Sequence, residues 1–291
     1  MKKTTCAAAI AATFIAAGVA GAGGQVPGEE IASLSYLGTG SVEFEDPEDA
    51  AKGGEVSLQE AALSAPLGEA KIGGISLVGG AWAGMTRLDF RGHPELGAEE
   101  LYGIAAIAAL SKESDVGWSW AAMAMPGFYG DFRSGRTGEG KMLLHAVAER
   151  PLGAGWKAQI GLAYDTAFGD PALYPVGGAI WKGGGGWTVN AVFPSPSAHW
   201  SQGGRWGFYV AAQPAGDRWI VDDEKDGEQV FRIESWRAGA GAEARIWGTV
   251  WLSAFAGREF ARSYEAKSGD RMLFEEDVDD AWFASIALAA Y

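Results

Sequence analysis

The segment Trp156–Asp165 alternates strictly between large apolar side chains and small or polar ones, and no other feature restricts the fold as much. A period of two residues predicts a β-strand whose two faces differ chemically. Aromatic rings close both ends of the apolar face, at Trp156 and Tyr164. The strand between them is roughly 26 Å long, which suits a strand that crosses a bilayer at a tilt.

The same alternation recurs at 187–193 and 205–213 with lower contrast. If such strands enclose a lumen, its selectivity should be set by the inward polar residues. The candidates for this lumen face are Lys157, Gln159, Asp165, Thr188, Asn190, Arg205, Gln213, Arg232 and Glu234. The aromatic residues expected to anchor the strands at the membrane interfaces are Trp156, Tyr164, Trp187, Phe193, Trp206 and Tyr291.

The connections between strands alternate in length. Short turns are predicted at 66–69, 111–115, 151–155, 183–186, 214–217 and 246–249, and longer charged or proline-containing loops at 45–55, 89–99, 130–141, 169–173, 194–204, 222–228 and 262–279. The pattern predicts an all-β fold, a closed antiparallel up-and-down transmembrane β-barrel of about fourteen strands, with short periplasmic turns and longer acidic outer loops. Losing the weakly patterned first hairpin, or the short strand at 218–221, would leave about twelve.

The N-terminus indicates export. Two lysines, an apolar run and an Ala-Gly-Ala site predict a signal peptide over residues 1–22, leaving the barrel domain at 23–291. The run is short for a transmembrane anchor, and Cys6 precedes it, which disfavours a lipoprotein. The remaining chain has no cysteine, so it must close without disulfides. A net charge of −14 argues against nucleic acid as a partner.

The C-terminal stretch is uncharged from Ala281 onward and ends in Tyr291. It predicts the closing strand, with Tyr291 as an anchor and a signal to the barrel-assembly machinery. The alternate residues before Tyr291 are mostly small, so they fit the usual barrel ending only loosely. The larger Trp282, Ile286 and Leu288 lie on the other face.

The segments "FPSPSAHWSQGGRWGFYVAAQ" and "RAGAGAEARIWGTVWLSAFAGREF" combine a strand ending in proline, an aromatic strand and a glycine-alanine strand. Over roughly residues 101–291 this pattern resembles bacterial outer-membrane β-barrel proteins, and within them an uncharacterised family known as a domain of unknown function. The resemblance implies an outer-membrane location and a barrel fold. It implies no activity.

One candidate for chemistry is the pair His199 and Ser201, whose His-x-Ser spacing resembles that of an outer-membrane lipid A deacylase. A serine nucleophile needs a base within hydrogen-bond reach, but the sequence indicates no acid partner. A polar surface loop is the favoured interpretation. His145 shares a face with Glu149, and the two could form a pair in the lumen.

The sequence therefore favours an integral outer-membrane barrel that lets solutes pass passively, like a porin, or has a structural role at the cell surface. The alternatives are a lipid hydrolase using His199 and Ser201, and a soluble exported β-sandwich that binds a ligand. We assign no catalytic residue, metal site or cofactor. The expected partners are outer-membrane lipids and lipopolysaccharide, and the barrel-assembly machinery; the pattern leaves the oligomeric state open.

Overall fold

A computed structural model describes residues 32–43, 54–91, 98–114, 117–132, 138–202, 204–223, 227–269 and 271–290. Regular structure in these ranges is β, apart from one short 3-10 helix, η1 (Gly184–Gly186). No helix in the described part of the chain is long and apolar enough to cross a bilayer. The predicted signal peptide at 1–22 and the terminal Tyr291 lie outside the described residues.

The first nine strands run from the N-terminal side to the middle of the chain. They are β1 (Ala32–Thr39), β2 (Val42–Glu43), β3 (Glu55–Ile72), β4 (Ile75–Arg91), β5 (Ala98–Lys112), β6 (Ser119–Gly130), β7 (Glu139–Gly153), β8 (Trp156–Asp165) and β9 (Ala172–Lys182). The remaining eight are β10 (Trp187–Phe193), β11 (Ser197–Gln202), β12 (Trp206–Pro214), β13 (Asp217–Asp223), β14 (Gly227–Trp247), β15 (Val250–Ser268), β16 (Arg271–Val278) and β17 (Ala281–Ala290).

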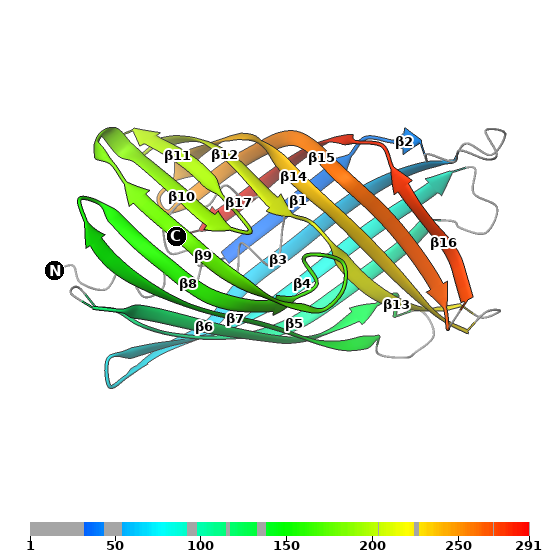
Figure 1. Ribbon diagram of the computed structural model, residues 1–291, viewed down its shortest axis with the longest axis horizontal. Coiled ribbons are helices and arrows are strands. Elements are labelled where there is room, and N and C mark those ends of the chain that lie inside the picture. Colours follow the sequence, from blue (N-terminus) through cyan, green and yellow to red (C-terminus); the bar gives the residue numbers. More distant parts are fainter. Residues whose placement is uncertain are drawn as a thin grey trace.

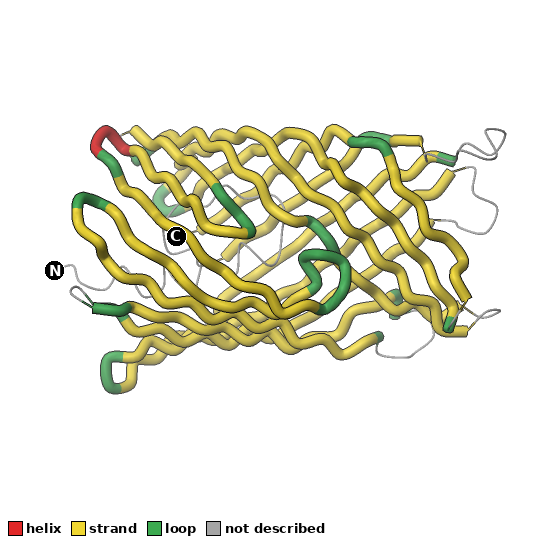
Figure 2. Tube along the Cα trace, viewed as in Figure 1, coloured by secondary structure: helices red, strands yellow, loops and turns green. Residues whose placement is uncertain are grey.

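These strands form one antiparallel sheet that closes on itself, as Figures 1 and 2 show. Three pairs of assigned strands each continue one another: β1 with β2 along β3, β12 with β13 along β14, and β16 with β17 along β15. The seventeen assignments therefore make fourteen wall strands. Pairing of β1 with β17, from Ala32 opposite Ala290 to Thr39 opposite Phe283, closes the barrel. A closed sheet leaves no unpaired edge, as a lipid environment requires.

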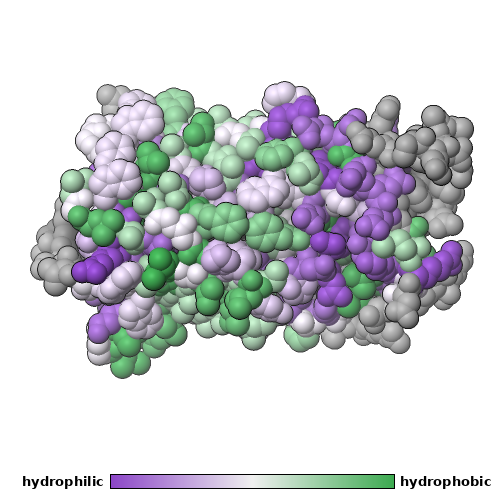
Figure 3. All heavy atoms as spheres, in the orientation of Figure 1, coloured by the Kyte–Doolittle hydropathy of each residue, from purple (hydrophilic) through white to green (hydrophobic). Residues whose placement is uncertain are grey.

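The two ends of the barrel differ. The turn side holds the tight turns at 73–74, 154–155 and 248–249, and the loop side is the opposite end, where β4, β6 and β13 end. Ala32 and Ala290 pair on the turn side. The apolar outer surface lies over the middle and the turn side, whereas the loop side is hydrophilic (Figure 3). A membrane band would therefore cover the turn-side part of the wall.

Outward side chains in this band are large and apolar. On β17, Trp282, Ile286 and Leu288 are exposed, whereas Phe283 and Ser285 are buried inside the barrel. The alternate residues before Tyr291 are small and fit the usual barrel ending only loosely because they lie on the inner face of β17. On β8, Ile160 is 56% exposed. Burial of the opposite face in the interior and exposure of these side chains is the pattern of a membrane barrel.

The predicted number of strands is confirmed, but two predicted connections are wrong in ways that cancel. The stretch 194–204 is not one loop, because it contains β11. The stretch 214–217 is not a turn between strands, because β12 and β13 on either side of it both pair with β14. Two further predicted connections are wrong: β3 continues past the predicted turn at 66–69 to a turn at 73–74, and the predicted loop at 262–279 is mostly strand, because β15 runs to Ser268 and pairs with β16. The closed fourteen-stranded wall rules out the twelve-stranded and β-sandwich alternatives.

The wall varies in height around the barrel. β14 has 21 residues and β15 has 19, whereas β10 has 7 and β11 has 6. Above the short strands, β13 reaches β6 and makes a parallel bridge with it, Ile220 opposite Gly130. The loop-side part of the barrel is therefore a narrower ring of fewer strands than the turn-side part, because the short strands do not contribute to it.

Candidate functional site

The interior of the barrel combines apolar clusters with buried polar and charged side chains. One cluster of buried residues lies mainly on the loop side and includes Leu88, Phe90, Trp219, Phe231 and Tyr264. A second cluster, on β5, β6 and β7, includes Ile107, Met123 and Leu143. Barrels with a wide aqueous channel have polar interiors, so this lumen is of a different kind.

A cavity of about 130 Å³ lies in the lumen. Its walls come from strands on all sides of the barrel. On one arc the lining residues are the polar Ser35, Glu60, Thr86, Gln213 and Arg237, which we call the polar arc. On the other they are Trp82, Leu101, Met125, Tyr129 and Leu143, which we call the apolar arc. A void of this size has room for water or one small molecule.

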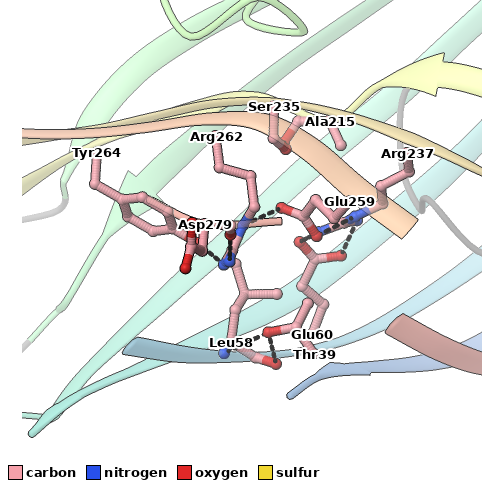
Figure 4. Close-up of polar contacts among 10 residues, drawn as sticks. All are labelled: Thr39, Leu58, Glu60, Ala215, Ser235, Arg237, Glu259, Arg262, Tyr264 and Asp279. Atoms are coloured by element: carbon pink, nitrogen blue, oxygen red, sulfur yellow. Dashed lines mark hydrogen bonds and ion pairs between the residues drawn. The ribbon is translucent and has the colours of Figure 1, made fainter. Parts of the chain in front are cut away.

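Arg237 lines this cavity and points toward Glu259 and Glu60 (Figure 4). Its Nη1 and Nη2 atoms each donate a hydrogen bond of 3.0 Å to Glu60 on β3, and its Nε donates one of 2.9 Å to Glu259 on β15. Arg237 and Glu259 are 2% and 0% exposed. Such buried charges persist only when they are paired and hydrogen-bonded, so these three residues form one structural unit.

A second arginine extends the network toward the loop side. Arg262 Nε lies 3.6 Å from Glu259 Oε1, and its other nitrogens donate to the backbone oxygen of Asp279 and to the hydroxyl of Tyr264 (Figure 4). Ala261 next to it has a φ of 49° and marks an irregularity in β15. The inward face of β15 changes there from odd-numbered to even-numbered residues, which turns Arg262 into the lumen.

The contact of β13 with β6 and β7 forms a polar seam. Lys141 Nζ lies 3.1 Å from Asp217 Oδ1, and Thr166 donates to the same oxygen at 2.7 Å. Arg218 Nη1 donates to Glu139 at 2.9 Å. Lys141 is buried, and its ammonium also lies over the rings of Tyr129 and Trp219. The seam thus holds the narrow ring closed above the short strands.

The structure places six of the nine lumen-face candidates on the inner face of strands. These are Lys157, Gln159, Asp165, Thr188, Asn190 and Gln213. Lys157 bonds Glu149 at 3.0 Å, and Gln213 lines the cavity. Arg205 is exposed in the turn at 204–205 instead, so it is at the rim.

Arg232 and Glu234 differ from the predicted inward orientation. Their neighbours Phe231 and Ile233 are buried in the interior, so the two charged side chains lie on the outer face. There Arg232 pairs with Glu234 at 2.8 Å and with Asp170 at 3.4 Å. The physical reason is that this part of β14 lies on the hydrophilic loop side, where the outer face meets water and the inner face is the apolar core.

The candidate anchors on strands all point outward. Trp156, Trp187 and Trp206 begin β8, β10 and β12 on the turn side, and Tyr164 and Phe193 lie at the loop-side ends of β8 and β10. Their positions form two levels, as aromatic girdles at the two interfaces of a membrane do. The role of Tyr291 stays a prediction.

His199 lies on β11 with its side chain inside the barrel, 5% exposed. Its Nε2 is 2.6 Å from Oε1 of Glu243 on β14, an acid partner that the sequence did not indicate. His145 pairs with Asp165 at 2.8 Å rather than with Glu149. Within the described ranges no group of three or more His, Cys, Asp or Glu side chains could hold a metal ion.

Sequence reasoning missed Glu60, Arg237 and Glu259, the central charges of the lumen. Their strands are rich in glycine and alanine on both faces, so periodicity does not orient them. One signal was present: an isolated charge in a strand of small residues is costly unless it is paired in the interior.

No family model matches the chain, and no curated protein matches it. Several solved structures are similar to this chain at low sequence identity. An outer-membrane channel from Pseudomonas putida F1 is 11% identical, with 89% of this chain and 94% of that chain covered and a TM-score of 0.49. A deltaS2 mutant of the TodX monoaromatic hydrocarbon channel is 10% identical, with 89% of each chain covered and a TM-score of 0.37. The β domain of the Bordetella autotransporter BrkA is 12% identical, with 90% and 99% covered and a TM-score of 0.33.

Proposed function

We propose that this chain is an integral outer-membrane barrel that lets small uncharged solutes pass through its lumen. The closed wall, the outward apolar side chains and the two levels of aromatic residues support the membrane location. In this orientation the turn side faces the periplasm and the hydrophilic loop side faces outward.

The observation that carries the solute class is the lining of the lumen. Its cavity is small, and the charges around it are paired: Glu60 with Arg237, Lys141 with Asp217, and Asp165 with His145. An ion that entered this lumen would lose its hydration without gaining a free counter-charge, and this desolvation costs about 3 kcal/mol or more. A small neutral molecule avoids that cost, so the lumen favours it.

Reconstitution into liposomes tests this function. We expect liposomes that carry the protein to take up small neutral solutes such as glycerol faster than protein-free liposomes, and to exclude disaccharides. In planar bilayers we expect ion conductance far below that of a wide porin. Uptake no faster than in empty liposomes would refute the passage and leave the structural role.

The structure supplies the acid partner that the lipid hydrolase alternative lacked, Glu243, but the pair has no access to lipid. His199 and Glu243 are both buried inside the barrel, whereas lipid lies outside the wall. A nucleophile and its base must reach the scissile bond, so this arrangement disfavours lipid hydrolysis.

The predicted partners also remain proposals. Lipopolysaccharide would meet the hydrophilic outer wall of the loop side, where Arg218 and Arg232 lie among acidic residues. Recognition by the assembly machinery through the C-terminal strand is tested by deleting Tyr291, which should reduce insertion into the outer membrane. Unchanged insertion would exclude that role.

A further inference from the structure

The polar arc of the lumen cavity contains side chains that have no hydrogen-bond partner. Gln213 and Thr86 line the cavity and bond no other group among the described residues. Ser35 also lines it, is 8% exposed and likewise lacks a partner in the described ranges. Ser35 is buried, whereas Gln213 and Thr86 are only partly buried. A buried polar group is normally paired, so the Ser35 hydroxyl calls for water or a ligand, and Gln213 and Thr86 can contact the same molecule. The carboxamide and the two hydroxyls can each donate and accept.

The apolar arc holds flat aromatic rings pressed against the wall. Trp82 and Tyr129 lie with their ring centroids 5.7 Å apart. A Cβ atom added at Gly103 would lie 2.6 Å from the Trp82 ring and 2.8 Å from the Tyr129 ring. A Cβ atom at Gly84 would meet the Trp82 ring, and one at Gly127 would meet the Tyr129 ring as well as the backbone oxygen of Ile104. These glycines make room for the rings at the wall, so the rings do not fill the lumen.

The size and charge of the cavity restrict its occupant. An apolar cavity of roughly 150 Å³ accommodates benzene, and the cavity here measures about 130 Å³. The ionic groups at its edge are already paired with each other, so they leave no charge for an ion to neutralise. The occupant that matches the cavity is therefore neutral and about the size of one six-membered ring.

We infer that this cavity is a binding site for a neutral single-ring molecule that carries a hydroxyl group. The ring packs against Trp82 and Tyr129, and the hydroxyl bonds the carboxamide of Gln213 or the hydroxyl of Ser35. The inference rests on the proposed function, because it names the class of solute for which the passage is built. Phenol is the simplest probe of this class, and toluene is its counterpart without a hydroxyl.

Binding of the two probes to the purified full chain in detergent tests the site. We expect saturable phenol binding, measured by calorimetry against empty micelles, and toluene binding about tenfold weaker, because the polar arc would then be left unpaired. Gln213→Leu should weaken phenol binding about three- to tenfold and leave toluene binding unchanged. Equal affinity for phenol and toluene, or no saturable binding, would overturn the proposal.

Two glycine variants distinguish binding of the probes in the cavity from their partition into the detergent micelle. Gly103→Ala should push the rings into the lumen and abolish binding of both probes. Gly79→Ala is its control on adjacent β4, because Gly79 is exposed on the outer face and has no atom within 4 Å of an added Cβ. Gly103→Ala protein that is folded, as judged by its heat-modifiable mobility, and still binds phenol like the parent would refute the site.

Binding and passage can fail separately. Saturable binding without uptake into liposomes would keep the site and reject the passage. Faster uptake of glycerol without saturable phenol binding would keep the passage and reject the site. If Gly103→Ala does not fold, Gln213→Leu tests the site instead, because it should weaken phenol binding and leave toluene binding unchanged.

Discussion

Arg237 and Glu60 are 177 residues apart in the chain, yet two hydrogen bonds of 3.0 Å join them across the lumen. Their strands, β14 and β3, are separated in the wall by β15, β17 and β1. The pair is therefore a strut between different parts of the wall, and it lies beside the cavity. A strut of opposite charges can both stabilise a barrel and determine what passes it.

Removing the central charge should destabilise the barrel. In Arg237→Met, Glu259 loses its strongest partner while it stays fully buried, which costs about 3–5 kcal/mol. Urea unfolding in lipid vesicles measures this loss. The matched control is Arg258→Met, whose pair with Asp280 is half exposed and should matter by less than about 1 kcal/mol. Equal stability of the two variants would contradict the strut.

Neutralising the other end should change ion selectivity. Glu60→Gln keeps a hydrogen-bond acceptor for Arg237 but removes one negative charge beside the cavity. The residual current through the barrel should then shift toward anions, since an uncompensated positive charge attracts them. The reversal potential under a salt gradient in planar bilayers reports this shift. A reversal potential equal to that of the parent would show that ions do not pass beside Glu60.

The sequence predicts the architecture well and the lumen only in part, and β14 shows why. Alternation indicates two faces but not which face is inside. In the membrane band the outer face is apolar, whereas on the loop side water lies outside and the interior is apolar. The alternation therefore predicts the wrong face for Arg232 and Glu234, while Arg237 on the same strand does point inward. Which face of a strand is inside therefore depends on where the apolar membrane band lies along that strand. The position of this band is a property of the whole barrel and cannot be read from one strand.

The strand β11 was missed for a local reason. Its six residues lie between Pro194 and Pro196 on one side and a glycine pair on the other, which are the usual signs of a loop. The pairing of Ser197–Gln202 with β10 and β12 outweighs those signs. β12 and β13 were split because Pro214 and Gly216 resemble a turn, although β14 supports both sides of the break.

The seam predicts a local change in dynamics. In Lys141→Met, Asp217 loses its ion pair with Lys141. The loop at 166–171 then contacts the Asp217 carboxylate, among the described side chains, only through the hydroxyl of Thr166. Amide hydrogen exchange should speed up at β13 and at 166–171, and not at β15. The matched variant Lys157→Met breaks a pair with Glu149 on the turn side and should leave the seam protected. Unchanged exchange at β13 would show that the backbone bridge alone holds the seam.

Introducing a charge on β17 tests which of its two faces contacts lipid. Ile286 is 49% exposed on the outer face, next to the buried Ser285. Ile286→Arg would place a charge against lipid, which costs about 2–4 kcal/mol near the middle of a bilayer. Folding yield in lipid vesicles should fall, and it should recover in short-chain detergent, where the arginine can reach water. Ser285→Ala, which alters the inner face by one hydroxyl, is the control and should fold like the parent. Equal yields for Ile286→Arg and Ser285→Ala in vesicles would mean that this face of β17 does not meet lipid.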